Sequence, residues 1–282
     1  MAREENRLVF EDTERLCRQN ERLVESIKNS INKQQLILEK DTYIVDTASG
    51  FTEKAKVIVS PKRTYEAASA YKGQAVVAHN FASASNPGGG VTRGANAQEE
   101  ALCRCSTLYF CLDIDELWKG FYLPHRKEKN PIHNDDCIYT PDVTVFKSDT
   151  KTPRLLSETD WYNVNVITCA APNLRERPSN QMNPGDGDKS INVSDDELLF
   201  IHEKRLSRIL DIAKQNKNDV VILGAFGCGA FANSPEVVAR AASNVIKEYL
   251  YDFKIIEFAV YCPPGDDRNY RVFKRVVGVY NK

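Results

Sequence analysis

The chain has 282 residues, of which 38 are Lys or Arg and 39 are Asp or Glu, so its formal charge is −1. This balance excludes a strongly basic nucleic-acid groove, whereas a nucleotide ligand held by backbone N–H groups is still compatible with it. Hydrophobic residues make up 42% and charged residues 27%, which excludes wholesale disorder. No apolar run approaches the ~18 residues of a membrane span, so neither nucleic acid nor a membrane is expected as a partner.

The first fifteen residues, MAREENRLVFEDTER, lack the apolar core of a secretory signal. The eight cysteines are therefore expected to stay reduced in the cytoplasm, or in the nucleus if the source is eukaryotic. Cys103 and Cys105 are the closest pair, and no CxxC or HxxxH partner accompanies them. The spacing favours small buried hydrophobes over a metal site.

Residues 11–40 are predicted to form one amphipathic helix, capped at Asp12 or Thr13. Its apolar positions recur near one face, at Leu16, Leu23, Ile27 and Ile31. We therefore expect a helical extension over residues 1–60, packed by that stripe on a body formed by residues 61–282.

Short β-rich or apolar runs alternate with helical patterns through the middle of the chain. The predicted strands cover residues 42–51, 56–60, 74–81, 138–146, which Pro141 interrupts, and 164–173. The predicted helices cover residues 97–112 and 195–216, and the predicted irregular segments cover residues 118–136 and 178–190.

The clearest unit lies near the C-terminus. Residues 219–226 form an apolar strand, residues 235–251 a helix with Ser234 and Pro235 at its start, and residues 253–261 a further strand. A strand, a helix and a strand in this order predict a βαβ unit, so at least part of the sheet is expected to be parallel.

A glycine loop connects the strand and helix of that unit. Gly224, Gly227 and Gly229 precede a helix N-terminus, where backbone N–H groups and the helix dipole favour a diphosphate. The spacing G-x-x-G-x-G fits neither the Rossmann nor the Walker pattern. A turn that merely needs glycines is the alternative.

A second glycine loop follows the strand at 74–81. Asn86-Pro87 leads into Gly88-Gly89-Gly90, and Gln98-Glu99-Glu100 then opens a helix. Three consecutive glycines indicate a backbone wrapped closely around a ligand, although two acids at a helix start also complement its dipole. Both glycine loops follow strands, so they are expected to face each other across the carboxyl edge of the sheet.

If the ligand contains a diphosphate and a sugar, Glu99 and Glu100 could act as acid and base in cleaving its glycosidic bond. Glycosidic cleavage needs an acid that protonates the leaving oxygen and a base that activates water, and one glutamate can do both in sequence. The helix N-terminus lowers a carboxyl pKa, however, so burial or the neighbouring carboxylate has to raise it.

The combination of these motifs resembles the microbial-type poly(ADP-ribose) glycohydrolases, whose body is a macrodomain. The matching stretches are FASASNPGGG, the QEE seven residues later, ALCRCSTLY, TCAAPN and GAFGCGAFANSP. The resemblance covers about residues 75–277, with the N-terminal helix as an extension typical of the family.

The resemblance implies a three-layer α/β/α macrodomain with a mixed sheet, which binds ADP-ribose in a cleft without a cofactor or metal. It implies that Glu100 is the catalytic acid/base, that Glu99 holds ribose hydroxyls and that Phe231 lies against the ribose. Asn86 is implied to orient the sugar. The implied substrate-binding set is Asn86, Gly88, Gly89, Gly90, Gln98, Gly224, Gly227, Cys228, Gly229, Ala230 and Phe231.

The expected activity is hydrolysis of ribose–ribose bonds in poly(ADP-ribose) on modified proteins, by a monomer. The alternatives are a hydrolase that removes single ADP-ribose units from proteins and, from other classes, a non-catalytic ADP-ribose reader or a Rossmann oxidoreductase. The intact QEE disfavours a reader, and the absence of an early G-x-G-x-x-G disfavours the oxidoreductase. No role is assigned to His79, His125, His133 or His202, and His125 and His133 are expected at the surface.

Overall fold

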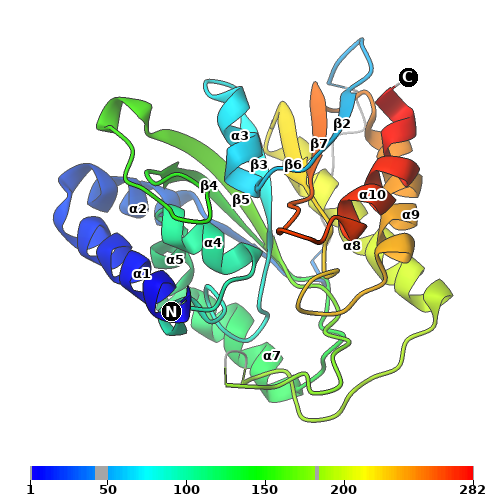
Figure 1. The fold of residues 1–282 in the computed structure, drawn as a ribbon, viewed down its shortest axis with the longest axis horizontal. Coiled ribbons are helices and arrows are strands. Elements are labelled where there is room, and N and C mark those ends of the chain that lie inside the picture. Colours follow the sequence, from blue (N-terminus) through cyan, green and yellow to red (C-terminus); the bar gives the residue numbers. More distant parts are fainter. Residues whose placement is uncertain (1, 42–49, 182–183, 282) are drawn as a thin grey trace.

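The computed structural model describes residues 2–41, 50–181 and 184–281 (Figure 1). The strand predicted at 42–51 falls largely on residues 42–49, outside the described residues. Seven described strands form one sheet in the order β1-β4-β5-β3-β6-β7-β2. The pairs β1–β4 and β4–β5 are antiparallel and all other pairs are parallel. The strands are β1 (Gln35–Ile37), β2 (Lys56–Ser60), β3 (Val76–Phe81), β4 (Cys137–Val145), β5 (Tyr162–Cys169), β6 (Val220–Leu223) and β7 (Ile255–Ala259).

Apolar residues on both faces of the sheet build two cores. In β6, Val220 and Ile222 belong to one cluster, whereas Val221 and Leu223 belong to the other, as the two-residue period of a strand requires. The described α-helices are α1 (Ala2–Gln19), α2 (Glu21–Lys33), α3 (Thr64–Ala68), α4 (Gln98–Cys105), α5 (Leu108–Leu112), α6 (Asp115–Leu117), α7 (Leu123–Glu128), α8 (Asp195–Gln215), α9 (Pro235–Val245) and α10 (Arg268–Val276).

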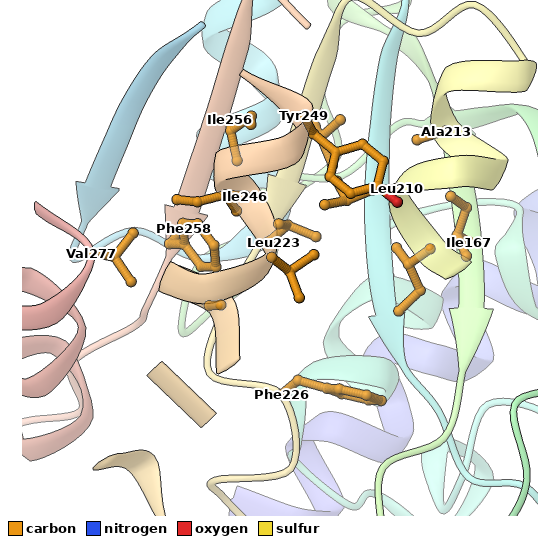
Figure 2. Close-up of a cluster of buried hydrophobic side chains, with 14 of the residues drawn as sticks. Ile167, Leu210, Ala213, Leu223, Phe226, Ile246, Tyr249, Ile256, Phe258 and Val277 are labelled. Carbon is orange, nitrogen blue, oxygen red and sulfur yellow. The ribbon is translucent and has the colours of Figure 1, made fainter. Parts of the chain in front are cut away.

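Helices cover the two faces separately. Helices α8, α9 and α10 pack on one face, where Leu223, Ile256 and Phe258 meet Ile246 and Tyr249 (Figure 2). Helices α3, α4 and α5 pack on the other face, and α1 lies against that layer (Figure 1). The predicted three-layer α/β/α architecture with a mixed, partly parallel sheet is confirmed.

The single helix predicted over residues 11–40 is wrong. Helix α1 begins at Ala2, and Asn20 ends it and caps α2, because its side chain accepts a hydrogen bond from the Leu23 amide at 3.2 Å. Residues 35–37 then pair with β4 as an edge strand. Asp12 and Thr13 lie inside α1 and cap nothing.

Other predicted elements differ mainly in their ends. The helix predicted at 97–112 is divided into α4 and α5 at Ser106, which forms a bridge to Val145. The segment 118–136, expected to be irregular, contains the π-helix η3 (Trp118–Tyr122) and α7. The register of β4 shifts between Thr140 and Val143, so the predicted interruption at Pro141 is confirmed.

The predicted βαβ unit is confirmed as β6, α9 and the parallel strand β7. Strands β1 and β2 lie within residues 1–60 and belong to the same sheet as the other described strands. The division at residue 60 stays a prediction. None of the helices in the described ranges is long and apolar enough to cross a membrane.

Candidate active site

A cleft of about 1130 Å³ lies at the carboxyl edge of the parallel strands. Its walls include Arg63 after β2, Ser83 after β3, Gly227 after β6 and Tyr261 after β7, together with the start of α4. The carboxyl ends of adjacent parallel strands share one edge, which is where α/β proteins bind ligands. The two glycine loops therefore line one cleft, as their positions after strands predicted.

Gly89 lies against both carboxylates of the glutamate pair. Its φ is +58°, and a Cβ atom there would lie 2.6 Å from Glu100 Oε1 and 3.1 Å from Glu99 Oε2. Any larger residue would combine backbone strain with a collision against both acids. The missing side chain at residue 89 thus makes room for the two carboxylates.

Backbone N–H groups fix Glu100. Its Oε1 accepts from the Gly90 amide and its Oε2 from the Ala97 amide, both at 2.9 Å. The side chain is buried, and it lines the cleft. Two donors on two oxygens leave the carboxylate one orientation, which is the condition for directed proton transfer.

Glu99 is more deeply buried, with 3% of its surface exposed. Its Oε2 accepts from the Ser83 amide at 2.8 Å and its Oε1 from Asn80 Nδ2 at 3.2 Å. Burial, and after it the charge of Glu100, raises the pKa of Glu99 well above its ordinary range despite these donors. Glu99 is therefore expected to retain its proton at a pH where an exposed glutamate would have lost it.

The side-chain amide of Gln98 forms hydrogen bonds to other groups of the protein. Its Nε2 donates to the His79 carbonyl at 2.7 Å and to Thr64 Oγ1 at 3.0 Å, and its Oε1 accepts from the Phe81 amide at 2.9 Å. Gln98 lines the cleft, and these contacts tie the start of α4 to the end of β3. Its structural effect is to place the two following glutamates.

The glycine loop between β6 and α9 supplies the opposite wall through residues 227–231. Asn233 shapes it, because its Nδ2 lies 2.6 Å from the Pro172 carbonyl, 3.1 Å from that of Phe231 and 3.2 Å from that of Gly227. His202 donates from Nε2 to Asn233 Oδ1 at 2.7 Å. Burial lowers the pKa of His202 to about 4, so the imidazole is neutral at pH 7.

Three residues of the predicted set lie outside the cleft lining. Asn86 accepts from Arg126 Nη2 and donates to Ser85 Oγ at 3.2 Å. A Cβ at Gly88 would lie 2.7 Å from Tyr109 Cδ2, and one at Gly224 would lie 2.7 Å from the Ala259 carbonyl. The lining contains the rest of the set, namely Gly89, Gly90, Gln98, Glu99, Glu100, Gly227, Cys228, Gly229, Ala230 and Phe231.

Several cleft residues are absent from the sequence-based set. The Arg63 guanidinium lies 4.0 Å from the centre of the Tyr261 ring and 3.8 Å from the buried carboxylate of Asp149. Arg175 lies over Phe231, 5.4 Å from the ring centre. Arg63 and Tyr261 each follow a parallel strand, so the shared carboxyl edge was the signal that could have found them.

The histidines lie apart from the glutamate pair. His79 is buried against Phe226, with ring centres 4.4 Å apart, and burial lowers its pKa to about 3. His125 and His133 are both 6% exposed, so their expected surface location is wrong. His133 bonds the Ala171 carbonyl at 2.8 Å. No group of three or more His, Cys, Asp or Glu in the described ranges is arranged to hold a metal ion.

Solved structures of other proteins share this fold. The poly(ADP-ribose) glycohydrolase (PARG) of Thermomonospora curvata superposes with a TM-score of 0.83 at 25% identity, over 96% of this chain and 99% of that one. The structure of the same protein bound to the inhibitor ADP-HPD superposes with a TM-score of 0.80 at 26% identity, over 96% of this chain and 98% of that one. The PARG of Deinococcus radiodurans in complex with ADP-ribose superposes with a TM-score of 0.75 at 28% identity, over 91% of this chain and 98% of that one.

A search among curated protein sequences gives no match. The family model of the microbial-type PARG catalytic domain matches residues 5–148, slightly more than half of the chain and the part that carries both the triple glycine and the glutamate pair. The chain therefore belongs to the family of microbial-type PARG catalytic domains.

Proposed function

We propose that this chain hydrolyses ribose–ribose O-glycosidic bonds of poly(ADP-ribose) and releases ADP-ribose, with Glu100 as the acid/base. The observation that carries the assignment is the pair of buried carboxylates in the cleft wall, one fixed by two backbone donors and the other of raised pKa. A site that only binds a sugar has no need to bury two acids side by side, because that costs stability.

The proposed reaction has two halves. First, Glu100 donates its proton to the oxygen that links the two riboses, the bond from C1 to that oxygen breaks, and positive charge develops on the donor ribose. Then the Glu100 carboxylate takes a proton from water while the hydroxide adds to C1, which restores the acid. Glu99, beside it, is proposed to hold ribose hydroxyls.

The remaining cleft walls are proposed to hold ADP-ribose. Backbone N–H groups of residues 227–231 face the diphosphate, with the N-terminus of α9 behind them, and Phe231 lies against the ribose. The D. radiodurans structure in complex with ADP-ribose and the T. curvata structure bound to the inhibitor ADP-HPD support ADP-ribose as the ligand. Asn86 is proposed to orient the sugar through the loop that it begins. We also propose that the chain acts as a cytoplasmic monomer on modified proteins.

A turnover assay with two substrates tests the proposal. Purified protein is incubated with poly(ADP-ribose) and, separately, with mono-ADP-ribosylated protein, and free ADP-ribose is quantified. Release from the polymer alone is the expected result. Release from the mono-modified protein alone would assign the alternative hydrolase activity, and binding without release from either substrate would assign a reader.

A further inference from the structure

The orientation of Glu100 depends on a short turn that precedes α4. The two amides that hold its carboxylate, those of Gly90 and Ala97, lie at opposite ends of this turn, residues 90–97. The Gly90 carbonyl closes the turn by accepting from the Arg93 amide at 3.0 Å and the Ala95 amide at 3.1 Å. A change in the shape of the turn would therefore move the donors that aim Glu100.

Arg104 holds the turn from inside the protein. It follows Glu100 by one helical turn and is 2% exposed. Its Nη1 donates to the Ala95 carbonyl at 2.6 Å and its Nη2 to Asn96 Oδ1 at 2.8 Å. None of the ion pairs in the described part of the chain includes Arg104. Burying a cation without an acidic partner costs free energy. The hydrogen bonds of the Arg104 guanidinium to residues 95 and 96 partly offset that cost and hold the turn in place.

Helix α1 holds the same turn from outside. Asn6 Nδ2 donates to the Gly94 carbonyl at 3.3 Å. Gly94 has a φ of +74°, and a Cβ atom there would overlap the carbonyl oxygen of Arg3. The backbones of α1 and the turn are thus in direct contact, and Arg3 itself reaches the cleft lining.

Helix α1 also bonds the helix that carries the glutamates. Thr13 Oγ1 lies 2.6 Å from the Arg104 carbonyl and donates to it. The buried Lys147 secures this contact from the body, because its Nζ donates to Thr13 Oγ1 at 2.8 Å and to the Val9 carbonyl at 3.0 Å. Thr13 is fully buried, so the contact is shielded from water.

We propose that α1 is a working part of the active site and that Arg104 and Thr13 are positioning residues, which act on Glu100 through the 90–97 turn. This inference rests on the proposed function, in which Glu100 transfers the proton. It differs from a purely structural role because it places the effect on the reaction step and leaves the ADP-ribose contacts of the opposite wall unchanged.

The first test compares two buried arginines. Arg104→Lys keeps the charge but loses the fork that grips the turn, and a small misplacement of a catalytic group costs up to ~10²-fold in rate. We expect kcat to fall at least about tenfold, with the Kd for ADP-ribose within about twofold. Arg205→Lys is the matched control, because Arg205 is equally buried and bonds residues away from the turn, namely Asp135, Ala170 and Ile132. It is expected to lower Tm without lowering kcat per folded molecule.

The second test acts from α1 and covers the case in which Arg104→Lys does not fold. Thr13→Val removes the hydroxyl at nearly constant volume and is expected to lower kcat. Thr13→Ser keeps the hydroxyl and is expected to restore it. A purely packing role would instead make serine, the smaller residue, the more harmful substitution.

A third comparison separates the α1 contact from backbone strain. Gly94→Ala adds a methyl group against α1 at a positive φ, whereas Gly73→Ala carries the same strain at φ +85° with open space around it. We expect kcat to fall only for Gly94→Ala. Unchanged kcat in Arg104→Lys, Thr13→Val and Gly94→Ala would overturn the inference while the wild type still releases ADP-ribose. A wild type that releases none would instead overturn the proposed function.

Discussion

Glu99 and Glu100 are adjacent in sequence, yet their carboxylates meet different surroundings. Glu100 accepts from the Gly90 and Ala97 amides of the turn that precedes its helix, whereas Glu99 accepts from Asn80 in β3 and from Ser83 just after that strand. Successive residues of a helix point about 100° apart, so both glutamates line the cleft while their carboxylates accept hydrogen bonds from different donors. Two chemically identical side chains can thus take different roles.

Glu100→Gln is expected to abolish most turnover while preserving binding. Glutamine keeps the shape and can still accept a backbone hydrogen bond, but it has no proton to donate and cannot act as a base. The rate should fall ~10²–10⁴-fold, or roughly 3–5 kcal/mol in barrier, with a nearly unchanged Kd for ADP-ribose. Rates of ADP-ribose release and calorimetric titration measure the two effects. Thermal melts come first, and a folded variant with the wild-type rate would remove Glu100 from the mechanism.

Glu99→Gln is expected to change how stability depends on pH. The pKa of Glu99 is raised in the folded state. The stability that Glu99 contributes is therefore fully present below its unfolded-state pKa, and it is lost as the pH rises through its folded-state pKa. The Tm of the wild type should therefore fall relative to that of Glu99→Gln by roughly 2–4 °C per pH unit above about pH 5. Melts of both proteins between pH 5 and 8 measure this. The exposed substitution Glu53→Gln should track the wild type, and parallel curves for Glu99→Gln would contradict the burial argument.

At the scale of elements, the conformation of the loop at residues 227–231 is fixed by buried side chains on the side away from the cleft. Asn233 bonds three carbonyls around the loop, and neutral His202 on α8 holds Asn233 in turn. Gly229 faces open space in front of this frame, with no atom within 4 Å of a Cβ built on it. Asn233 thus supports the loop from within the protein, whereas Gly229 contributes to the cleft surface.

Gly229→Val is expected to block the diphosphate without harming the fold. The added side chain occupies the cleft, and hydrogen bonds to a charged group are worth ~1.5–3 kcal/mol each. Loss of one or more of them should raise the Kd for ADP-ribose at least about tenfold. Gly229→Ala should give a smaller increase, and calorimetry on both variants tests the gradation. Wild-type affinity in Gly229→Val would exclude the loop from the binding site.

The sequence predicts the site best where its motifs are local. Glu99, Glu100 and residues 227–231 lie in contiguous loops next to recognisable strands, so their place at one sheet edge was within reach. The wall at Arg63, Asp149 and Tyr261 is harder to predict, because three distant segments meet there. The shared carboxyl edge of β2 and β7 is the signal for Arg63 and Tyr261, and Asp149 has no such signal. The three-residue strand β1 exists only through its pairing with β4, and apolar periodicity on both sides of Asn20 concealed the helix break.

At the scale of the whole molecule, charge is balanced both overall and within the cleft. The net charge is −1. The cleft lining mixes both signs, with basic and acidic side chains interspersed, namely Arg3, Lys62, Arg63, Arg175 and Arg268 with Glu99, Glu100, Asp149 and Asp266. Such a mixed lining creates no strong field of one sign. Recognition of the diphosphate is therefore expected to depend on directed N–H groups.

The affinity for ADP-ribose is accordingly expected to depend only weakly on salt. Each phosphate contact that releases a counterion from a nucleic acid contributes a slope of about −0.9 in log K against log salt. We expect a slope shallower than about −1 for the whole ligand over roughly 50 to 300 mM NaCl, a range that brackets physiological ionic strength. Calorimetry across that series measures it, and a slope several times steeper would assign the diphosphate to Lys and Arg side chains.

The pairing of β2 with β7 has a consequence for the order of events during synthesis. Lys56 of β2 pairs with Ile255 of β7, and among the described strands β2 has no other neighbour in the sheet. On the ribosome, β2 and Arg63, which follows it, emerge long before β7, the strand with which β2 pairs. Contacts of such long sequence separation slow folding and leave strand edges exposed. The nascent chain thus carries both glutamates long before it has a cleft in which they can act.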